Sequence, residues 1–240
     1  AVSGADTINI PAGTYIITFP GTNEDANATG DWDVLSPITL QGAGMGNTVL
    51  NGGGLDMVLH GINTDLTIRS LTITNGDGGM LQNGGNLVVE SVRIAGNTAI
   101  SWRAGGATVF NANATMTDSI VEDNHFNATS HWQGGGYAFS ATVGGPMLSM
   151  RIERSIIRNN TNKSHGGGIF FGTNTGRPMT GLITNSAIVG NKTIGVGGGL
   201  MTDDTGTLTV ENTTISDNEA SIGSAIFADA SANSILLRHV

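Results

Sequence analysis

The chain has 240 residues, with 19 acidic and 10 basic side chains, a net charge of −9, 37 glycines and no cysteine. The negative charge argues against nucleic acid or an anionic membrane as a partner, and the lack of cysteine excludes a disulfide scaffold and cysteinyl metal sites. No apolar stretch reaches the roughly 18 residues that a membrane-spanning helix needs, so none is predicted.

One phrase recurs along the chain: an apolar-x-apolar step, a polar pair, a second such step and a final Asn. An incomplete copy at 66–73 is followed by copies at 87–97, 114–124, 150–160, 181–191 and 208–218, and by a partial copy at 235–240. The final Asn residues are 27, 36, 31 and 27 residues apart. Internal repeats of this length are typical of solenoids.

The repeats predict strands, because apolar and polar residues alternate between Gly, Asn and Asp. Three strands and three turns in each step describe one coil of a right-handed parallel β-helix. We therefore expect an all-β solenoid of about eight coils with three short parallel sheets, forming a single domain over 1–240. Equivalent residues should stack in two inward columns: Leu66, Leu87, Ala114, Met150, Leu208 and Ile235, and Ile68, Val89, Met116, Ile152, Ile183, Val210 and Leu237.

The final Asn residues and the small-residue triplets have structural explanations. Asn tolerates left-handed backbone conformations, and stacked amides can hydrogen bond along the axis, so we expect these Asn residues to form tight turns and a ladder. They are Asn97, Asn124, Asn160, Asn191 and Asn218. The triplets should serve bends that a Cβ atom would obstruct. They end at Ala107, Gly136, Gly168, Gly199 and Ala225.

The phrases at 6–15, 30–34, 38–44 and 48–56, together with the Gly triplets and the S-x-I-x-x-N phrases, carry a resemblance. They resemble bacterial β-helix repeat proteins of the CSLREA-domain and polymorphic outer-membrane type, within the pectate-lyase-like superfold. The resemblance covers nearly the whole chain. It implies a secreted or surface-displayed protein with a structural or adhesive role, and it assigns no catalytic residue. The family's opening Cys-containing segment and its C-terminal anchor are missing, so we expect a processed or excised part of a longer chain.

One group of side chains is not explained by repetition. With the last residue of each triplet taken as the common register, three successive coils place aromatic, basic and imidazole groups on one loop-bearing flank, which we call the predicted flank. Its members are Trp102, Arg103, His131, Trp132, Lys163 and His165. Aromatic faces and cations suit a polysaccharide, through stacking and charge-assisted hydrogen bonds.

The predicted flank leaves two functions open beside a purely structural one. It could bind a carbohydrate without reacting with it. Alternatively, the chain could be a polysaccharide-active enzyme, a lyase of acidic polysaccharide or a glycoside hydrolase, with Lys163, His165 or His131 as the base. A fold of this kind hosts both classes, so the fold does not decide between them. The adhesive function is favoured.

Acidic pairs offer a weaker signal. Glu122–Asp123 and Asp203–Asp204 could serve a hydrolase or bind Ca²⁺, but a structural role is favoured for both pairs, and Asp203–Asp204 is expected to lie in a turn. Asp31 and Asp33 belong to the family-like phrase and are interpreted as structural. The five histidines show no i, i+2 or i, i+4 pairing, so no metal site is predicted. Ca²⁺ is the one cofactor left open.

Self-association is the remaining expectation. The middle residues of the second strand in each phrase should point outward, and Ile120, Ile156 and Ala187 would form an apolar stripe. Neither terminus shows a capping helix, so open coil ends could also stack head to tail into filaments. The sequence thus predicts an extracellular or cell-surface protein with a polysaccharide or a second copy of itself as partner.

Overall fold

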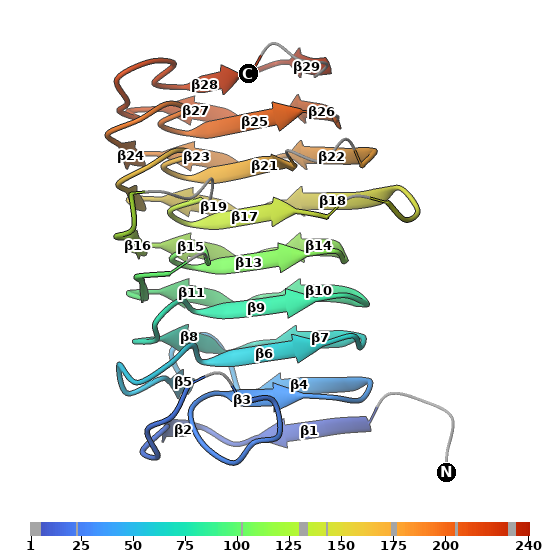
Figure 1. Ribbon diagram of the computed structural model, residues 1–240, viewed down its shortest axis with the longest axis vertical. Helices are drawn as coiled ribbons and strands as arrows, with labels where there is room; N and C mark the ends of the chain where they lie inside the picture. Colours follow the sequence, from blue (N-terminus) through green and yellow to red (C-terminus); the bar gives the residue numbers. More distant parts are fainter. Residues whose placement is uncertain are drawn as a thin grey trace.

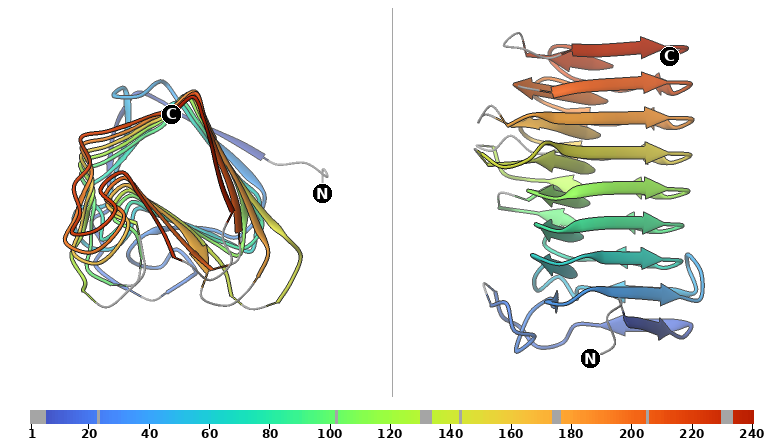
Figure 2. Two further views of the ribbon diagram at one scale, coloured as in Figure 1. Left: turned by 90° about the horizontal axis from the view of Figure 1, so that it is seen from above. Right: turned by 90° about the vertical axis from the view of Figure 1, so that its right-hand side faces the viewer.

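The chain folds into a right-handed parallel β-helix, as predicted. A computed structural model describes residues 6–22, 24–101, 103–129, 134–142, 144–173, 177–204, 206–229 and 234–240, and these contain no helix. Successive coils stack along one axis, with the first coil at one end and the last at the other (Figure 1). Viewed down that axis the coils nearly superimpose (Figure 2). The described part of the chain accordingly offers no helix that could cross a membrane.

Four parallel sheets, named A to D, hold the strands of the described residues. Sheet A contains β1 (Asp6–Ile10), β4 (Ile38–Gly42), β7 (Leu66–Arg69), β10 (Asn86–Glu90), β14 (Asn113–Thr117), β18 (Leu148–Glu153), β22 (Met179–Thr184), β26 (Gly206–Glu211) and β29 (Ser234–Arg238). Sheet B contains β2 (Gly13–Ile16), β5 (Thr48–Asn51), β8 (Thr72–Thr74), β11 (Arg93–Ala95), β15 (Ile120–Glu122), β19 (Ile156–Arg158), β23 (Ala187–Val189) and β27 (Thr214–Ser216). Sheet C contains β3 (Trp32–Val34), β6 (Leu59–Ile62), β9 (Met80–Asn83), β13 (Ala107–Phe110), β17 (Tyr137–Ser140), β21 (Ile169–Thr173), β25 (Leu200–Asp204) and β28 (Ile226–Ala228). Sheet D contains β12 (Thr98–Ala99), β16 (His125–Phe126), β20 (Thr161–Asn162) and β24 (Lys192–Thr193).

A middle coil runs from sheet C through sheets A and B to sheet D. The three long sheets match the prediction, but sheet D adds a fourth. Its strands have two residues each and directly follow the final Asn of a phrase. A two-residue strand is too short to show alternation, so the sequence pattern could not reveal it.

Both predicted inward columns are confirmed by the strand register of sheet A. Leu87 pairs with Leu66 and with Ala114, and Val89 pairs with Ile68 and with Met116. The remaining members follow in the same register. One coil contributes Gly181 to the first column. The space beside Gly181 is filled by neighbours, because a Cβ there would lie 2.5 Å from Leu208 Cδ1 and 2.9 Å from Phe171 Cε2. Packing density is thus kept although one coil lacks the side chain.

The predicted Asn ladder is present and buried. The backbone N–H and the Nδ2 group of Asn124 both donate to Asn160 Oδ1, at 3.1 and 3.0 Å. The Nδ2 group of Asn124 also donates to the carbonyl of Ile94 at 2.9 Å. Asn97, Asn160 and Asn191 repeat this pattern toward the next Asn in the chain. Each amide therefore satisfies a donor of the coil beside it, which an apolar side chain could not do.

The prediction that the ladder Asn residues adopt the left-handed backbone conformation is wrong by one position. The residues with positive φ are those that precede the ladder: Gly96, Asp123, Asn159, Gly190 and Asp217. Their φ values lie between 54° and 66°. The turn is made by the preceding residue, and the ladder Asn then points its amide inward. Gly, Asn and Asp are the residues that tolerate this conformation.

The Gly triplets allow close approach between coils. A Cβ on Gly136 would lie 2.7 Å from Asn160 Nδ2, and one on Gly106 would lie 2.3 Å from the carbonyl oxygen of Gly136. The triplets therefore pass directly over the Asn ladder, where a side chain has no room. The prediction that a Cβ would be obstructed is confirmed, and the obstacle is the neighbouring coil.

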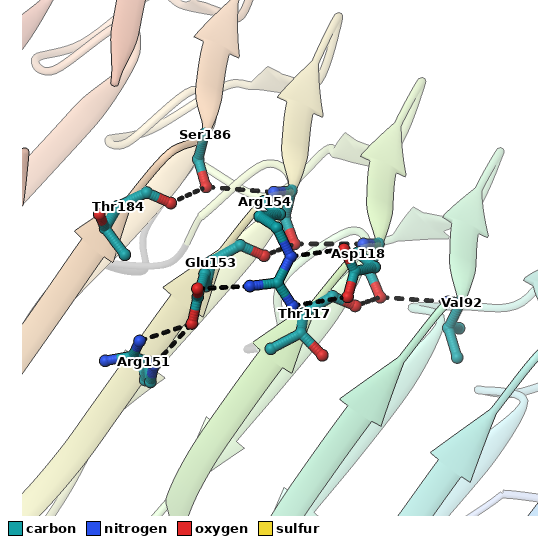
Figure 3. Close-up of polar contacts among 10 residues, drawn as sticks. Val92, Thr117, Asp118, Arg151, Glu153, Arg154, Thr184 and Ser186 are labelled. Atoms are coloured by element: carbon teal, nitrogen blue, oxygen red, sulfur yellow. Dashed lines mark hydrogen bonds and ion pairs between the residues drawn. The ribbon is translucent and has the colours of Figure 1, made fainter. Parts of the chain in front are cut away.

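A hydroxyl ladder follows the turn between sheets A and B (Figure 3). The backbone N–H of Ser119 donates to Ser155 Oγ at 3.2 Å, and that of Ser155 donates to Ser186 Oγ at 3.1 Å. Beside it, Arg154 donates to both carboxylate oxygens of Asp118 at 2.8 Å. The S-x-I-x-x-N phrase thus carries two ladders, one at each end.

We predict that Asn160→Ala lowers the free energy of unfolding by roughly 3–5 kcal/mol. The variant removes the buried acceptor of the Asn124 backbone N–H and of one Nδ2 hydrogen of Asn124, and one of the two donors to Asn191 Oδ1. Urea denaturation followed by circular dichroism measures this. Asn113→Ala is the matched control, since it removes an amide–amide hydrogen bond to Asn86 that is exposed. Equal losses in the two variants would contradict a special role for burial.

Candidate functional site

The outward-facing column of sheet C changes character along the axis. Strand register aligns, from the first coil to the last, Asp33, His60, Leu81, Thr108, Ala138, Phe170, Met201 and Phe227. Ala138, Phe170 and Met201 are buried with Ala104 in a second apolar cluster outside the β-helix interior. Ala104 and Val196, from segments that lead into sheet C, pack in this cluster. The first two positions instead carry ionisable side chains, Asp33 and His60.

Asp33 and His60 face outward because their strand neighbours face the core. Trp32 and Val34 on β3, and Leu59 on β6, pack in the main hydrophobic cluster. Strand alternation then directs Asp33 and His60, which are register partners, to the opposite side. Both residues are nonetheless buried, with 8% and 9% of their surface exposed.

The segment 24–31 covers Asp33 from outside. Asn27, at φ 57°, donates from its backbone N–H to Asp33 Oδ2 at 2.9 Å and from Nδ2 to the Asp33 carbonyl at 2.8 Å. It also accepts from the Asp33 backbone N–H at 2.8 Å. Gly30, at φ 75°, lies so close to Gly21 that a Cβ on Gly30 would be 2.6 Å from the carbonyl oxygen of Gly21. These contacts fix the approach of the chain to β3, and with it the position of Asp31.

Asp31, Asp56 and Arg103 complete the group. Asp56 accepts from the Met57 backbone N–H at 2.7 Å and pairs with Arg103 Nη1 at 3.3 Å. Arg103 lies in the loop between β12 and β13 and Asp56 lies before β6, so this ion pair joins two coils with one coil between them. Asp31 and Asp56 are only 4% and 3% exposed. We call this set, with Asp25, Asp33 and His60, the acidic hollow. All of these residues except Asp33 line a hollow of about 250 Å³, together with Glu24, Met57, Leu81 and Asn83. Asp33 adjoins the hollow through His60, whose Nδ1 lies 3.6 Å from Asp33 Oδ1.

Burial and mutual repulsion determine the charges in the acidic hollow. Burial raises the pKa of Asp31 to about 7, and the carboxylates of Asp33 and Asp56 add to this effect. Burial also raises the pKa of Asp33, against the opposing influence of the Asn27 N–H and of His60. Burial lowers the pKa of His60, although Asp25 and Asp33 act in the other direction. Carboxylates outnumber cations, so the acidic hollow attracts positive charge or hydrogen-bond donors.

Among the carboxylates and the imidazole of this group, three polar atoms are buried without a hydrogen-bond partner: Asp31 Oδ2, Asp33 Oδ1 and His60 Nε2. Leaving a buried polar atom unsatisfied costs about 1–3 kcal/mol. Folding alone does not explain why three such atoms gather in one place, since the column carries no ionisable side chain in the later coils. The acidic hollow is therefore the strongest candidate site among the described residues.

The predicted flank is seen only in part. Trp102, His131 and Trp132 lie outside the described residues, so the flank as a set stays a prediction. Arg103 pairs with Asp56 and thus belongs to the acidic hollow. Lys163 is exposed, and His165 is half-buried with a pKa lowered by burial. The assumed register was wrong by one residue, because Ala107 pairs with Tyr137 and therefore Gly106, not Ala107, is equivalent to Gly136.

Glu122 has a structural role. Its carboxylate accepts from Arg93 Nε at 2.5 Å and from Arg158 Nε at 2.6 Å, and its side chain is 6% exposed. These hydrogen bonds outweigh burial and lower the pKa of Glu122. The turn expected at Asp203–Asp204 is wrong, because both residues belong to strand β25, where Asp203 is buried. The stripe residues Ile120, Ile156 and Ala187 stack in register on sheet B and are each partly exposed.

Sequence reasoning missed the acidic hollow because its carboxylates and His60 come from the first two coils, where the phrase is irregular. Arg103 was identified but was assigned to the predicted flank. Asp31 and Asp33 were interpreted as structural, and the search for His pairs considered spacing within one strand only. The available signal was the exchange of apolar for ionisable residues in one column, which requires the register between β3 and β6.

Comparison with known proteins adds little beyond the fold. No family model and no curated protein matches the chain. Among solved structures, it is similar to the A-module of the Azotobacter vinelandii mannuronan C-5 epimerase AlgE6, at 12% identity and a TM-score of 0.40, over 97% of this chain and 91% of that one. It is also similar to the catalytic unit of a thermostable GH87 α-1,3-glucanase from Streptomyces thermodiastaticus strain HF3-3, at 15% identity and a TM-score of 0.26, over 96% of this chain and 62% of that one. Neither likeness bears on the activity of this chain.

We predict that Asp31 makes stability fall as the pH rises. The folded-state pKa of Asp31 lies at about 7, above the ordinary value of 3.8. The stability that the protonated Asp31 allows is therefore fully present below pH 4 and is lost as the pH rises through 7. Asp31→Asn, which stays neutral, should therefore be more stable than the wild type at pH 8.5 by up to about 4 kcal/mol, and about equal to it at pH 4.

Urea denaturation at both pH values in the presence of a chelator measures the difference. Asp6→Asn on the exposed strand β1 is the control, because it removes a carboxylate without removing a buried one. If the free energies of unfolding of Asp31→Asn and wild type differ by the same amount at pH 4 and pH 8.5, then Asp31 does not titrate in this range.

Proposed function

We propose that the protein is an extracellular, adhesive β-helix protein that binds a neutral, hydroxyl-rich saccharide at the acidic hollow. The observation that carries this proposal is the exchange of apolar for ionisable residues in the outward column of sheet C, at the place where the surface is hollowed. A repeat protein has no packing reason for that exchange. The resemblance to bacterial surface β-helix proteins supports the extracellular location.

The chemistry of the acidic hollow determines the class of ligand. Exposed Asp25 and half-buried Glu24 at its rim, and half-buried Asn83 on β9, can accept hydrogen bonds from sugar hydroxyls. Arg103 can donate to ring and hydroxyl oxygens, with only 13% of its side chain exposed. The excess of carboxylates repels polymers of uronic acids. A neutral glycan is therefore favoured over the acidic polysaccharide that a lyase would need.

The enzymatic alternative rests on the predicted flank. Burial lowers the pKa of His165, which keeps the imidazole neutral at pH 7 and able to accept a proton. Lys163, two residues earlier, is exposed and could pair with a uronate carboxylate. These two residues, with His131 as a further candidate base, would carry a lyase reaction on an acidic polysaccharide.

Self-association through the stripe of Ile120, Ile156 and Ala187 is a second adhesive function that the register on sheet B supports. We expect wild type to associate with rising concentration in sedimentation experiments and Ile156→Glu to stay monomeric. If wild type stays monomeric at all concentrations tested, the proposed self-association is wrong.

The saccharide site is tested by calorimetric titration with neutral oligosaccharides (glucans, xylan and chitin fragments) and with oligouronates, in the presence of a chelator. We expect binding of a neutral oligosaccharide that weakens at least roughly tenfold in Asn83→Ala and in Arg103→Gln, since each removes a hydrogen-bonding group from the acidic hollow. Lys163→Ala and His165→Gln are matched controls that should bind as wild type does.

Other outcomes separate the alternatives. Loss of binding in the two control variants alone would move the site to the predicted flank. Release of unsaturated uronate products that disappears in Lys163→Ala and His165→Gln would replace the adhesive function by a lyase. No binding to any oligosaccharide would overturn the proposed function.

A further inference from the structure

Three ligand atoms converge at the base of the acidic hollow. Asp25 Oδ1, Asp33 Oδ1 and His60 Nδ1 all lie within 4.8 Å of one another. His60 Nδ1 is 3.6 Å from each of the two carboxylate oxygens. The three residues come from the segment before β3, from β3 and from β6, so they share no sequence motif.

The spacing does not fit direct hydrogen bonds. An N–H···O hydrogen bond has a donor–acceptor distance of about 2.7–3.2 Å, and 3.6 Å is too long. Two atoms that each lie about 2.1 Å from a common ion at tetrahedral angles are about 3.4 Å apart. The distances between His60 Nδ1 and the two oxygens therefore suit a shared cation better than they suit a protonated imidazole between two carboxylates.

An independent observation points to the same ligand. The side chain of Asp33 is fully buried, at 0% exposure, and its Oδ1 has no hydrogen-bond partner. Its other oxygen, Oδ2, accepts from the Asn27 backbone N–H, which fixes the carboxylate with Oδ1 directed toward His60. A buried carboxylate oxygen held in this way needs a positive partner. Arg103 is engaged with Asp56 across the acidic hollow.

The donor set indicates the kind of ion. One imidazole nitrogen and two carboxylate oxygens suit Zn²⁺ or Mn²⁺, whereas Ca²⁺ and Mg²⁺ prefer oxygen ligands throughout. Asp25 is 66% exposed at its side chain, so the side of the site that faces the acidic hollow is open to water. Three protein ligands and an open position are typical of an accessible metal site.

We propose that Asp25, Asp33 and His60 form a binding site for one divalent transition-metal ion, Zn²⁺ or Mn²⁺, at the first two coils of sheet C. The site does not depend on the proposed saccharide binding. An ion bound there joins β3, β6 and the segment 24–31, and it stabilises the end of the solenoid at which the outward column carries no apolar cluster.

The test uses the whole chain after treatment with a chelator, titrated calorimetrically with ZnCl₂ and MnCl₂. We expect one ion per chain and a higher melting temperature with the ion. Asp33→Asn and His60→Gln should each weaken binding of the ion at least tenfold. His165→Gln is the control: it removes an imidazole that lies outside the acidic hollow, so it should bind the ion as wild type does. Co²⁺ in place of Zn²⁺ should give a visible absorption spectrum that His60→Gln changes.

Asp25→Asn keeps the test decisive if the buried variants do not fold, because Asp25 is exposed and its loss leaves the Asn27 contacts in place. Binding that is absent in wild type, or that is unchanged in Asp25→Asn, Asp33→Asn and His60→Gln, would overturn the metal site. The saccharide titration is done with a chelator present, so failure of one proposal is distinguishable from failure of the other.

Discussion

Each coil of this protein must match the coil beside it in register, and the buried amide ladder shows what that constraint requires. A ladder Asn satisfies the backbone N–H and the Nδ2 group of the previous one, so each amide has its position set by two neighbours. The glycines that pass over the ladder follow from the same constraint, since no Cβ fits there. The sheets, the columns and the turns are consequences of keeping that register.

At the acidic hollow, neighbouring coils no longer repeat the same kinds of residue. The outward column of sheet C packs in an apolar cluster in the later coils, as at Ala138 and Phe170, and becomes ionisable at Asp33 and His60. The segment 24–31 covers this end with hydrogen bonds from Asn27 in place of apolar contacts. Buried charge is expensive unless it is paired, so this end has more need of a ligand than any apolar part of the column.

Sequence patterns predicted the repeated part of the fold well and the irregular part poorly. The columns through Leu87 and Val89 could be aligned because their phrase is nearly constant, and the Asn ladder followed from it. The conformational reason given for the Asn residues was wrong by one position, because the pattern does not say which residue of a turn takes positive φ. The contacts of Asp33, His60 and Arg103 could not be predicted, since they depend on register between coils that share no phrase.

The uneven spacing of the ladder residues has a practical consequence. Asn124 and Asn160 stack at hydrogen-bond distance although 36 residues separate them, against 27 between Asn97 and Asn124. The extra residues leave the coil and return to the same register, and lengthening such an excursion changes the closure entropy only with the logarithm of its length. The connection between β17 and β18 is therefore a natural grafting point. A foreign peptide inserted there would be presented on a rigid rod, at a height chosen by the number of coils beneath it.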